Sequence, residues 1–255
     1  MKITSNIRFL LLTAILCFVF INAYSQTPDE LYNAGLNDAK AQNYTEAIEN
    51  FTKFITMFPN DPDVVKAYSF RGKCYYFTKE YDNAIGDFNK VIETSPDNFE
   101  AFFLRAASYF SQKKYNEAVN DYTKAIELKP DNANAYKQRG SAYNGLSKYK
   151  EAITDFTKSI ELKSDDPSSY YNRGISYYAS NDTAKALADY SKAIELKADY
   201  TSAYLNRGNI YLDLNKYLEA INDYEKVIAL APDYESKLRP VIDQCKERLK
   251  TDTPK

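Results

Sequence analysis

Five arginines and five aspartates recur through the chain at a fixed spacing, and their side chains are the ones best placed to do chemistry. Each arginine is followed sixteen residues later by an aspartate, which gives the pairs Arg71 and Asp87, Arg105 and Asp121, Arg139 and Asp155, Arg173 and Asp189, and Arg207 and Asp223. A guanidinium can hold one carboxylate through two parallel hydrogen bonds, or it can offer its charge to an anionic ligand. Because every arginine comes with its own aspartate, we interpret the ten residues as a structural ladder of ion pairs.

Other reactive chemistry has little support in the composition. The 255 residues include no histidine, which removes the commonest general base and the commonest metal ligand. Cys74 and Cys245 are widely separated, and we interpret both as small buried hydrophobes. The sequence also has no glycine-rich phosphate loop and no metal-ligand motif. We therefore expect no catalytic residue, no metal and no cofactor, and an enzyme is the least favoured class.

The net charge and the first residues bear on location and partner. A net charge of −2 gives no electrostatic reason to expect nucleic acid. Lys2 and Arg8 precede a run of fifteen mostly apolar residues at 9–23, and Ala-Tyr-Ser precedes Gln26. A spanning helix needs about 20 apolar residues, so residues 1–25 are predicted to be a cleaved signal peptide, with a retained anchor as the alternative. The mature protein is then exported, periplasmic or secreted in bacterial style, without membrane insertion.

The arginines and aspartates belong to a longer periodic pattern. Alanines recur in steps of 34 residues at Ala84, Ala118, Ala152, Ala186 and Ala220, and tyrosines keep the same step at Tyr75, Tyr109, Tyr143, Tyr177 and Tyr211. Within each period one helical apolar pattern is followed by a turn and then by a second helical pattern. A period of this length is typical of an array of supersecondary units.

This helix–turn–helix period resembles the tetratricopeptide repeat. In 133–166 the matching positions are Tyr136, Gly140, Tyr143, Ala152, Phe156 and Ser159. The resemblance implies an all-α, right-handed solenoid over 28–234, with six units at 28–61, 65–98, 99–132, 133–166, 167–200 and 201–234. Residues 235–250 are predicted to form a C-terminal helix that covers the last unit, and we expect it to begin close to Pro240 or to kink there.

The outward face of the first helix in each unit carries the candidate binding residues. At about 100° per residue, these positions lie opposite the packing residues. The candidates are Tyr76, Phe77, Phe103, Phe110, Tyr171, Asn172, Tyr178, Asn206 and Asn209. The resemblance implies that this face lines a groove for an extended or helical peptide segment, with amides that hold the peptide backbone. The aromatic residues could equally pack between neighbouring first helices, and both readings stand at this point.

The function predicted from the sequence is that of a protein-interaction scaffold or adaptor, which binds a segment of another protein in envelope assembly or maintenance. A binder of small molecules or glycans, which would use the aromatic groove, is the alternative. Lys137 and Asn172 match the carboxylate clamp with which some family members hold chaperone C-termini. Ser141, Ser202 and Asn206 replace the other residues of that clamp, so we do not expect one.

Overall fold

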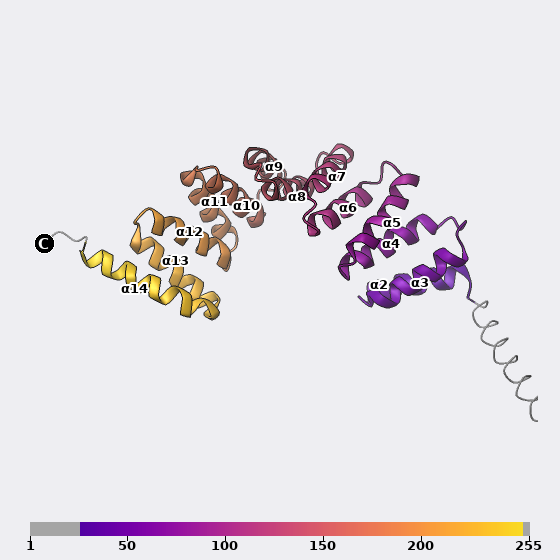
Figure 1. Ribbon diagram of the computed structural model, residues 1–255, viewed down its shortest axis with the longest axis horizontal. Helices are drawn as coiled ribbons and strands as arrows, with labels where there is room; N and C mark the ends of the chain where they lie inside the picture. The colour runs from indigo at the N-terminus through magenta and orange to yellow at the C-terminus, as the bar shows by residue number, and fades with distance from the viewer. Residues whose placement is uncertain (1–25, 252–255) are drawn as a thin grey trace, which may run out of the picture. The chain divides into compact units, whose positions relative to one another are not determined.

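The computed structural model describes residues 26–251, which form thirteen α-helices, one short 3-10 helix and no strand (Figure 1). The all-α prediction is therefore confirmed, while the predicted signal peptide at 1–25 lies outside the described residues. In chain order the elements are α2 (Pro28–Lys40), α3 (Tyr44–Met57), α4 (Val64–Phe77), α5 (Tyr81–Thr94), α6 (Phe99–Ser111), α7 (Tyr115–Leu128), α8 (Ala133–Gly145), α9 (Tyr149–Leu162), α10 (Pro167–Ala179), α11 (Thr183–Leu196), α12 (Thr201–Asp213), α13 (Tyr217–Leu230), η1 (Pro232–Tyr234) and α14 (Glu235–Thr251). None of the helices within 26–251 has the length and apolarity that a membrane span requires.

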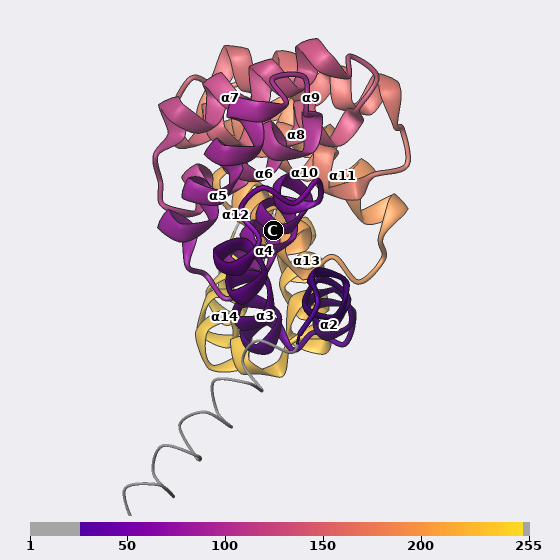
Figure 2. The ribbon, with the colours of Figure 1, turned by 90° about the vertical axis from the view of Figure 1, so that its right-hand side faces the viewer.

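The chain divides into two compact units, with the boundary inside α6 after Ser108. In the N-terminal unit, α2 to α5 pack in succession, each against the next. In the C-terminal unit the same holds from α7 to α14, and α12, α13 and α14 lie side by side in both views (Figures 1 and 2). We call α2, α4, α6, α8, α10 and α12 the first helices, and α3, α5, α7, α9, α11 and α13 the second helices.

In five of the helix pairs an aromatic ring of the second helix fills the space above a glycine of the first helix, whereas α6 has Ala106 at that position. Phe156 is fully buried, and a Cβ atom added to Gly140 would lie 3.1 Å from its ring. A Cβ atom on Gly174 would lie 2.8 Å from the buried ring of Tyr190. The glycine is therefore required because the ring occupies the place of its missing side chain.

Six turns between first and second helices share one backbone conformation. Each contains a non-glycine residue with positive φ between 56° and 66°: Gln42, Lys79, Lys113, Ser147, Asn181 and Asn215. The N–H of the next residue then donates back to a carbonyl of the first helix, as Lys148 does to Tyr143 at 2.9 Å. This left-handed residue and its back-bond end the first helix and allow the second helix to begin two residues later.

The second helices end at an equivalent residue whether or not a proline follows. Pro130 lies after α7, whereas α9 and α11 end at Leu162 and Leu196 without one. In each case the cap residue turns to a more extended conformation, and its N–H still bonds the carbonyl four residues earlier, as Lys163 bonds Ser159. Proline is thus compatible with the helix end without causing it.

Helix α14 begins at Glu235, five residues before Pro240, which lies inside it. Leu238 and Ile242 are buried on either side of the proline and join a cluster that contains Val227 of α13. Burial of these side chains offsets the hydrogen bond that the proline cannot make, so tertiary packing decides where the helix begins.

Four of the five arginines join three helices each. Arg139 on α8 donates through Nε and Nη2 to the two carboxylate oxygens of Asp155 on α9, at 2.7 and 2.8 Å. Its Nη1 donates to Thr123 Oγ1 on α7, the preceding second helix, at 3.0 Å. The rings of Tyr136 and Tyr143 lie 5.7 and 5.9 Å from the guanidinium carbon. The side chain of Arg139 is only 17% exposed and that of Asp155 only 5%.

The same arrangement recurs at three other arginines. The paired aspartate and the hydroxyl acceptor are Asp87 and Thr52 for Arg71, Asp189 and Thr157 for Arg173, and Asp223 and Ser191 for Arg207. Arg105 donates to Asn89 on the preceding second helix at 2.6 Å. Because Arg105 and Asp121 belong to different units, their pairing stays a prediction.

Substitution of the Arg139–Asp155 pair should show strong coupling. Arg139→Leu alone leaves a buried carboxylate without its partner and should lower the free energy of unfolding by about 3–5 kcal/mol. Adding Asp155→Leu to that variant should restore most of the loss, because no uncompensated charge then remains. Urea titrations of both single variants and the double variant measure the coupling, and simple additivity would contradict the contact.

Candidate binding surfaces on the first helices

The predicted groove residues differ in how far they are exposed. Phe77 on α4 is 58% exposed and Tyr178 on α10 is 43% exposed, whereas most aromatic side chains of the first helices are half-buried or buried. Asn209 on α12 is also exposed. Phe77 lies in the N-terminal unit, and Tyr178 and Asn209 lie in the C-terminal unit.

A pocket of about 440 Å³ lies against α2, α3 and α4, and we call it the apolar pocket. Its lining residues are Leu36, Ala39, Lys40, Tyr44, Phe70, Lys73, Cys74 and Phe77. The rings of Tyr44 and Phe77 stack with their centroids 5.0 Å apart and their planes 16° apart, and they form one wall. Burial raises the pKa of the Cys74 thiol to about 11, so at neutral pH the cysteine is an uncharged apolar group.

Two lysines supply the charge of the apolar pocket. Lys73 Nζ lies 2.8 Å from Glu100 Oε1 on α6 and 5.0 Å from the centroid of the Phe70 ring. Lys40 is the last residue of α2 and is exposed, and within residues 26–251 it forms no ion pair. The pocket thus combines aromatic walls with two ammonium groups, of which one is already partly neutralised.

A second pocket, of about 250 Å³, lies against α10, α11 and α12, and we call it the amide pocket. Its lining residues are Ile175, Tyr178, Ala179, Tyr190, Asn206 and Asn209. Tyr224 donates its hydroxyl to Asn209 Oδ1 at 2.9 Å, and Asn206 Nδ2 donates to the Tyr171 hydroxyl at 3.2 Å. Burial raises the pKa of Tyr190, so its hydroxyl stays protonated at neutral pH.

The two pockets occupy equivalent places in the repeat pattern. Four periods of 34 residues separate Phe70 from Asn206, and the same distance separates Lys73 from Asn209. At these positions the apolar pocket has an aromatic ring and a cation, whereas the amide pocket has two neutral amides. Equivalent positions of the repeat therefore carry different side-chain chemistry in the two compact units.

The remaining candidate residues line neither pocket. Tyr76 meets Phe77 edge-on at 5.7 Å, Phe103 stacks on Phe99 at 5.7 Å, and Phe110 meets Tyr115 at 5.4 Å. The backbone carbonyl of Asn172 accepts the Ser176 hydroxyl at 3.0 Å. Tyr171 also lines neither pocket, and its ring lies 4.9 Å from that of Tyr200. A binding role for these five candidates stays a prediction.

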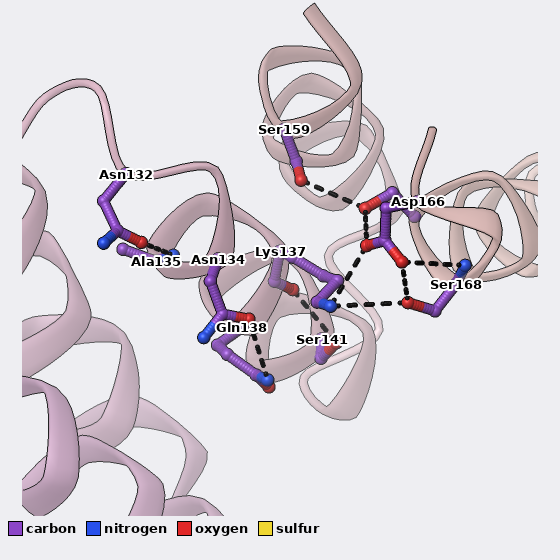
Figure 3. A network of polar contacts seen from close by, with 10 residues as sticks. Asn132, Asn134, Ala135, Lys137, Gln138, Ser141, Ser159, Asp166 and Ser168 are labelled. Carbon is purple, nitrogen blue, oxygen red and sulfur yellow. Dashed lines mark hydrogen bonds and ion pairs between the residues drawn. The ribbon is translucent and has the colours of Figure 1, made fainter. Parts of the chain in front are cut away.

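A polar network that the sequence pattern did not predict joins α8 to the beginning of α10 (Figure 3). Lys137 Nζ lies 3.0 Å from Asp166 Oδ2 and 3.3 Å from Ser168 Oγ. Asp166 also accepts the hydroxyls of Ser168 at 2.6 Å and Ser169 at 2.8 Å, and Ser169 in turn contacts Ser159 (Figure 3). The available signal was Asp166 directly before Pro167, which is typical of a helix N-cap.

This network removes Lys137 from the candidates for ligand binding. Its ammonium is paired with Asp166, and both side chains are about four-fifths buried, at 22% and 19% exposed. Burial alone would raise the pKa of Asp166, but hydrogen bonds from Ser168, Ser169 and Lys137 outweigh it and lower the pKa to about 2. No group of histidine, cysteine, aspartate and glutamate residues within 26–251 is arranged to hold a metal ion.

Family models for tetratricopeptide sequences match much of the chain. The model described as TPR repeat matches residues 106–147, 140–180 and 174–215, and the model described as Tetratricopeptide repeat matches 201–234. Together they cover 106–234, which is more than half of the 255 residues. A model described as Anaphase-promoting complex, cyclosome, subunit 3 matches 40–125. No curated protein sequence matches the chain.

Solved structures share the fold at low sequence identity. A crystal structure of MamA is 25% identical, with a TM-score of 0.61, and the match covers 65% of this chain and 96% of MamA. MamA from Desulfovibrio magneticus RS-1 is 20% identical over 68% of this chain and 96% of its own, with a TM-score of 0.64. YrrB, described as a TPR protein with an unusual peptide-binding site, is 21% identical over 76% of this chain and 98% of its own, with a TM-score of 0.61.

The Asp166 network should make stability depend on pH. A carboxyl whose pKa is lowered by folding stabilises the protein above its ordinary pKa near 4, and it loses that contribution as the pH falls towards 2. Wild type should therefore melt higher than Asp166→Asn at pH 6, and this difference should shrink with acidification.

Asparagine is a suitable replacement because Asn132, one period earlier, caps α8 through its side chain. Thermal melts across the pH range check this prediction, with the exposed neighbour Asp165→Asn as the control. A difference between wild type and Asp166→Asn that stays constant with pH would contradict it.

Proposed function

Because the chain belongs to the tetratricopeptide repeat family, we propose that it is a protein-interaction scaffold that holds a segment of a partner protein against its first helices. The observation that carries this proposal is the exposed aromatic wall of the apolar pocket. A phenylalanine that is 58% exposed, stacked on a tyrosine and set beside a pocket of about 440 Å³, offers apolar surface that a partner side chain can cover.

The amide pocket supports the same proposal in the C-terminal unit. Tyr178 presents an exposed ring there, and Asn206 and Asn209 place amide groups beside it. Amide side chains can both donate to and accept from a peptide backbone. Asn206 and Asn209 already share hydrogen bonds with tyrosine hydroxyls, and these bonds fix the orientation of both amides before a ligand binds.

The arginine ladder supports a role outside ligand binding for the ten residues of the sequence motif. In the four complete cases the guanidinium donates to an aspartate and to a hydroxyl within the protein, between two aromatic rings. We therefore assign ligand contacts to the pockets, and we assign no catalytic role to the chain.

We also propose that the protein acts after export, in assembly or maintenance of a bacterial envelope. This part rests on the sequence of residues 1–25, with its basic start, its short apolar run and its Ala-Tyr-Ser site. A scaffold outside the cytoplasm would meet its partner among exported proteins.

Substitution of Phe77 tests the scaffold proposal. Phe77→Ala removes an anchor and should weaken capture of the native partner by about 2 kcal/mol, or roughly 30-fold, with little effect on the melting temperature. Leu218→Ala is the matched control, because Leu218 on the second helix α13 is also 58% exposed. Cross-linked capture from the native envelope, quantified by mass spectrometry, measures the effect. Equal losses in the two variants would contradict the assignment of this surface, and binding of a glycan in place of a protein would favour the alternative function.

The export proposal predicts a defined mature end. Cleavage after Ser25 should give a protein that begins at Gln26 and is recovered outside the cytoplasm. Mass analysis of the N-terminal peptide from natively expressed protein checks this. Recovery of intact Met1 in a membrane fraction would show a retained anchor.

A further inference from the structure

The apolar pocket of the N-terminal unit combines features that select one kind of peptide. Leu36, Phe70 and the stacked rings of Tyr44 and Phe77 form apolar walls, and the volume of about 440 Å³ is enough for an aromatic side chain. The ammonium groups of Lys40 and Lys73 belong to the same lining. An apolar side chain alone would leave the ammonium of Lys40 without a partner and that of Lys73 with only an exposed one.

We propose that this pocket binds an aromatic or large aliphatic side chain of the partner segment whose neighbouring residue is acidic, with the carboxylate held by Lys40 and Lys73. The inference deepens the proposed function and rests on it. It commits the pocket to a peptide segment that carries an apolar residue and a carboxylate side by side. The same lysines would disfavour a segment with a basic residue at that place.

Lys40 is available to such a carboxylate. It is exposed, it ends α2, and it forms no ion pair within the described part of the chain. A ligand carboxylate can therefore pair with it without first breaking a contact. An ion pair formed beside aromatic walls is also less screened by solvent than one on an open surface.

To bind the carboxylate of a ligand, Lys73 must give up its ion pair with Glu100. Its side chain is 26% exposed and pairs with Glu100, whose side chain is 55% exposed. An exposed glutamate gains little from such a pair, so a ligand carboxylate that is anchored by its apolar neighbour can replace it. Glu100 thus acts as an internal competitor for Lys73 whenever the pocket is empty.

The amide pocket provides a comparison within the same chain. Asn206 and Asn209 stand there at the places of Phe70 and Lys73, and neither carries a charge. The preference for an acidic residue should therefore belong to the apolar pocket alone. This difference makes the proposal specific to Lys40 and Lys73.

Selection from a random peptide library on the full mature chain tests the proposal. On wild type, we expect peptides with an aromatic or large aliphatic residue next to an aspartate or glutamate. On the double variant Lys40→Gln, Lys73→Gln, the apolar residue should still be selected and the acidic residue should not. On Phe77→Ala, the selection of the apolar residue should be lost.

Affinities of the strongest selected peptide give the second readout. Lys40→Gln and Lys73→Gln should each weaken binding about two- to fivefold, as expected for partly exposed charge pairs. Glu100→Gln should strengthen binding about two- to fivefold, because it removes the competitor for Lys73. Asp97→Asn, at an exposed acidic residue before α6, is the control and should change nothing.

The outcomes separate this inference from the proposed function. Selection that depends on Phe77 without an acidic preference, or an acidic preference that survives the double lysine variant, overturns the inference and leaves the scaffold function standing. An unchanged or weakened affinity in Glu100→Gln also overturns the assignment of Lys73. Failure to select any peptide on wild type contradicts both proposals, whereas selection that is unchanged in Phe77→Ala overturns the inference and the assignment of this surface.

Discussion

The architecture depends on a guanidinium contact that recurs in four of the helix pairs, at Arg71, Arg139, Arg173 and Arg207. The arginine holds the aspartate of its own second helix through two hydrogen bonds and a hydroxyl of the preceding second helix through a third, as Arg139 does with Asp155 and Thr123. A planar fork can serve three helices at once, whereas the ammonium of lysine has no fixed fork geometry. Since these arginines bond groups within the protein, the polar groups that line the two pockets of the first helices are lysines and amides.

Much of this arrangement of helices and ion pairs can be predicted from the sequence, because a contact inferred in one repeat is expected at the same positions of the next repeat. The sixteen-residue step from arginine to aspartate predicted contacts that the structure shows at Arg71, Arg139, Arg173 and Arg207. The hydroxyl acceptors were not predicted. Threonine and serine are common on exposed helix faces, so their presence alone does not indicate a contact. In addition, the sequence separation between Thr52 and Arg71 differs from that between Thr123 and Arg139, because extra residues lie between the first two repeats.

The turn residues with positive φ show why the conformational preference of a single residue does not predict these turns. Glycine and asparagine favour positive φ, yet Gln42, Lys79 and Ser147 have positive φ at the same place in the turn as Asn181. The packing of the two flanking helices determines the backbone conformation of the turn, and the residue at this position has positive φ whatever its type.

The surface residues were predicted less completely than the arrangement of helices and ion pairs. Helical periodicity gives the direction of a side chain but not its neighbours, so Phe77 and Phe110 looked alike in the sequence. In the structure Phe77 forms the wall of a pocket, and Phe110 packs on Tyr115. Lys137 likewise looked available until Asp166, from a distant turn, was found beside it.

The bond from each arginine to the preceding second helix has a consequence for the length of the array. Thr157 and Ser191 stand one period apart and present the same hydroxyl to Arg173 and Arg207. Excision of residues 167–200 would therefore bring Arg207 against Thr157 with its bonding pattern intact. The arginine contacts at Arg173 and Arg207 are therefore interchangeable, so one whole repeat can be gained or lost there while the contact to the preceding second helix is kept.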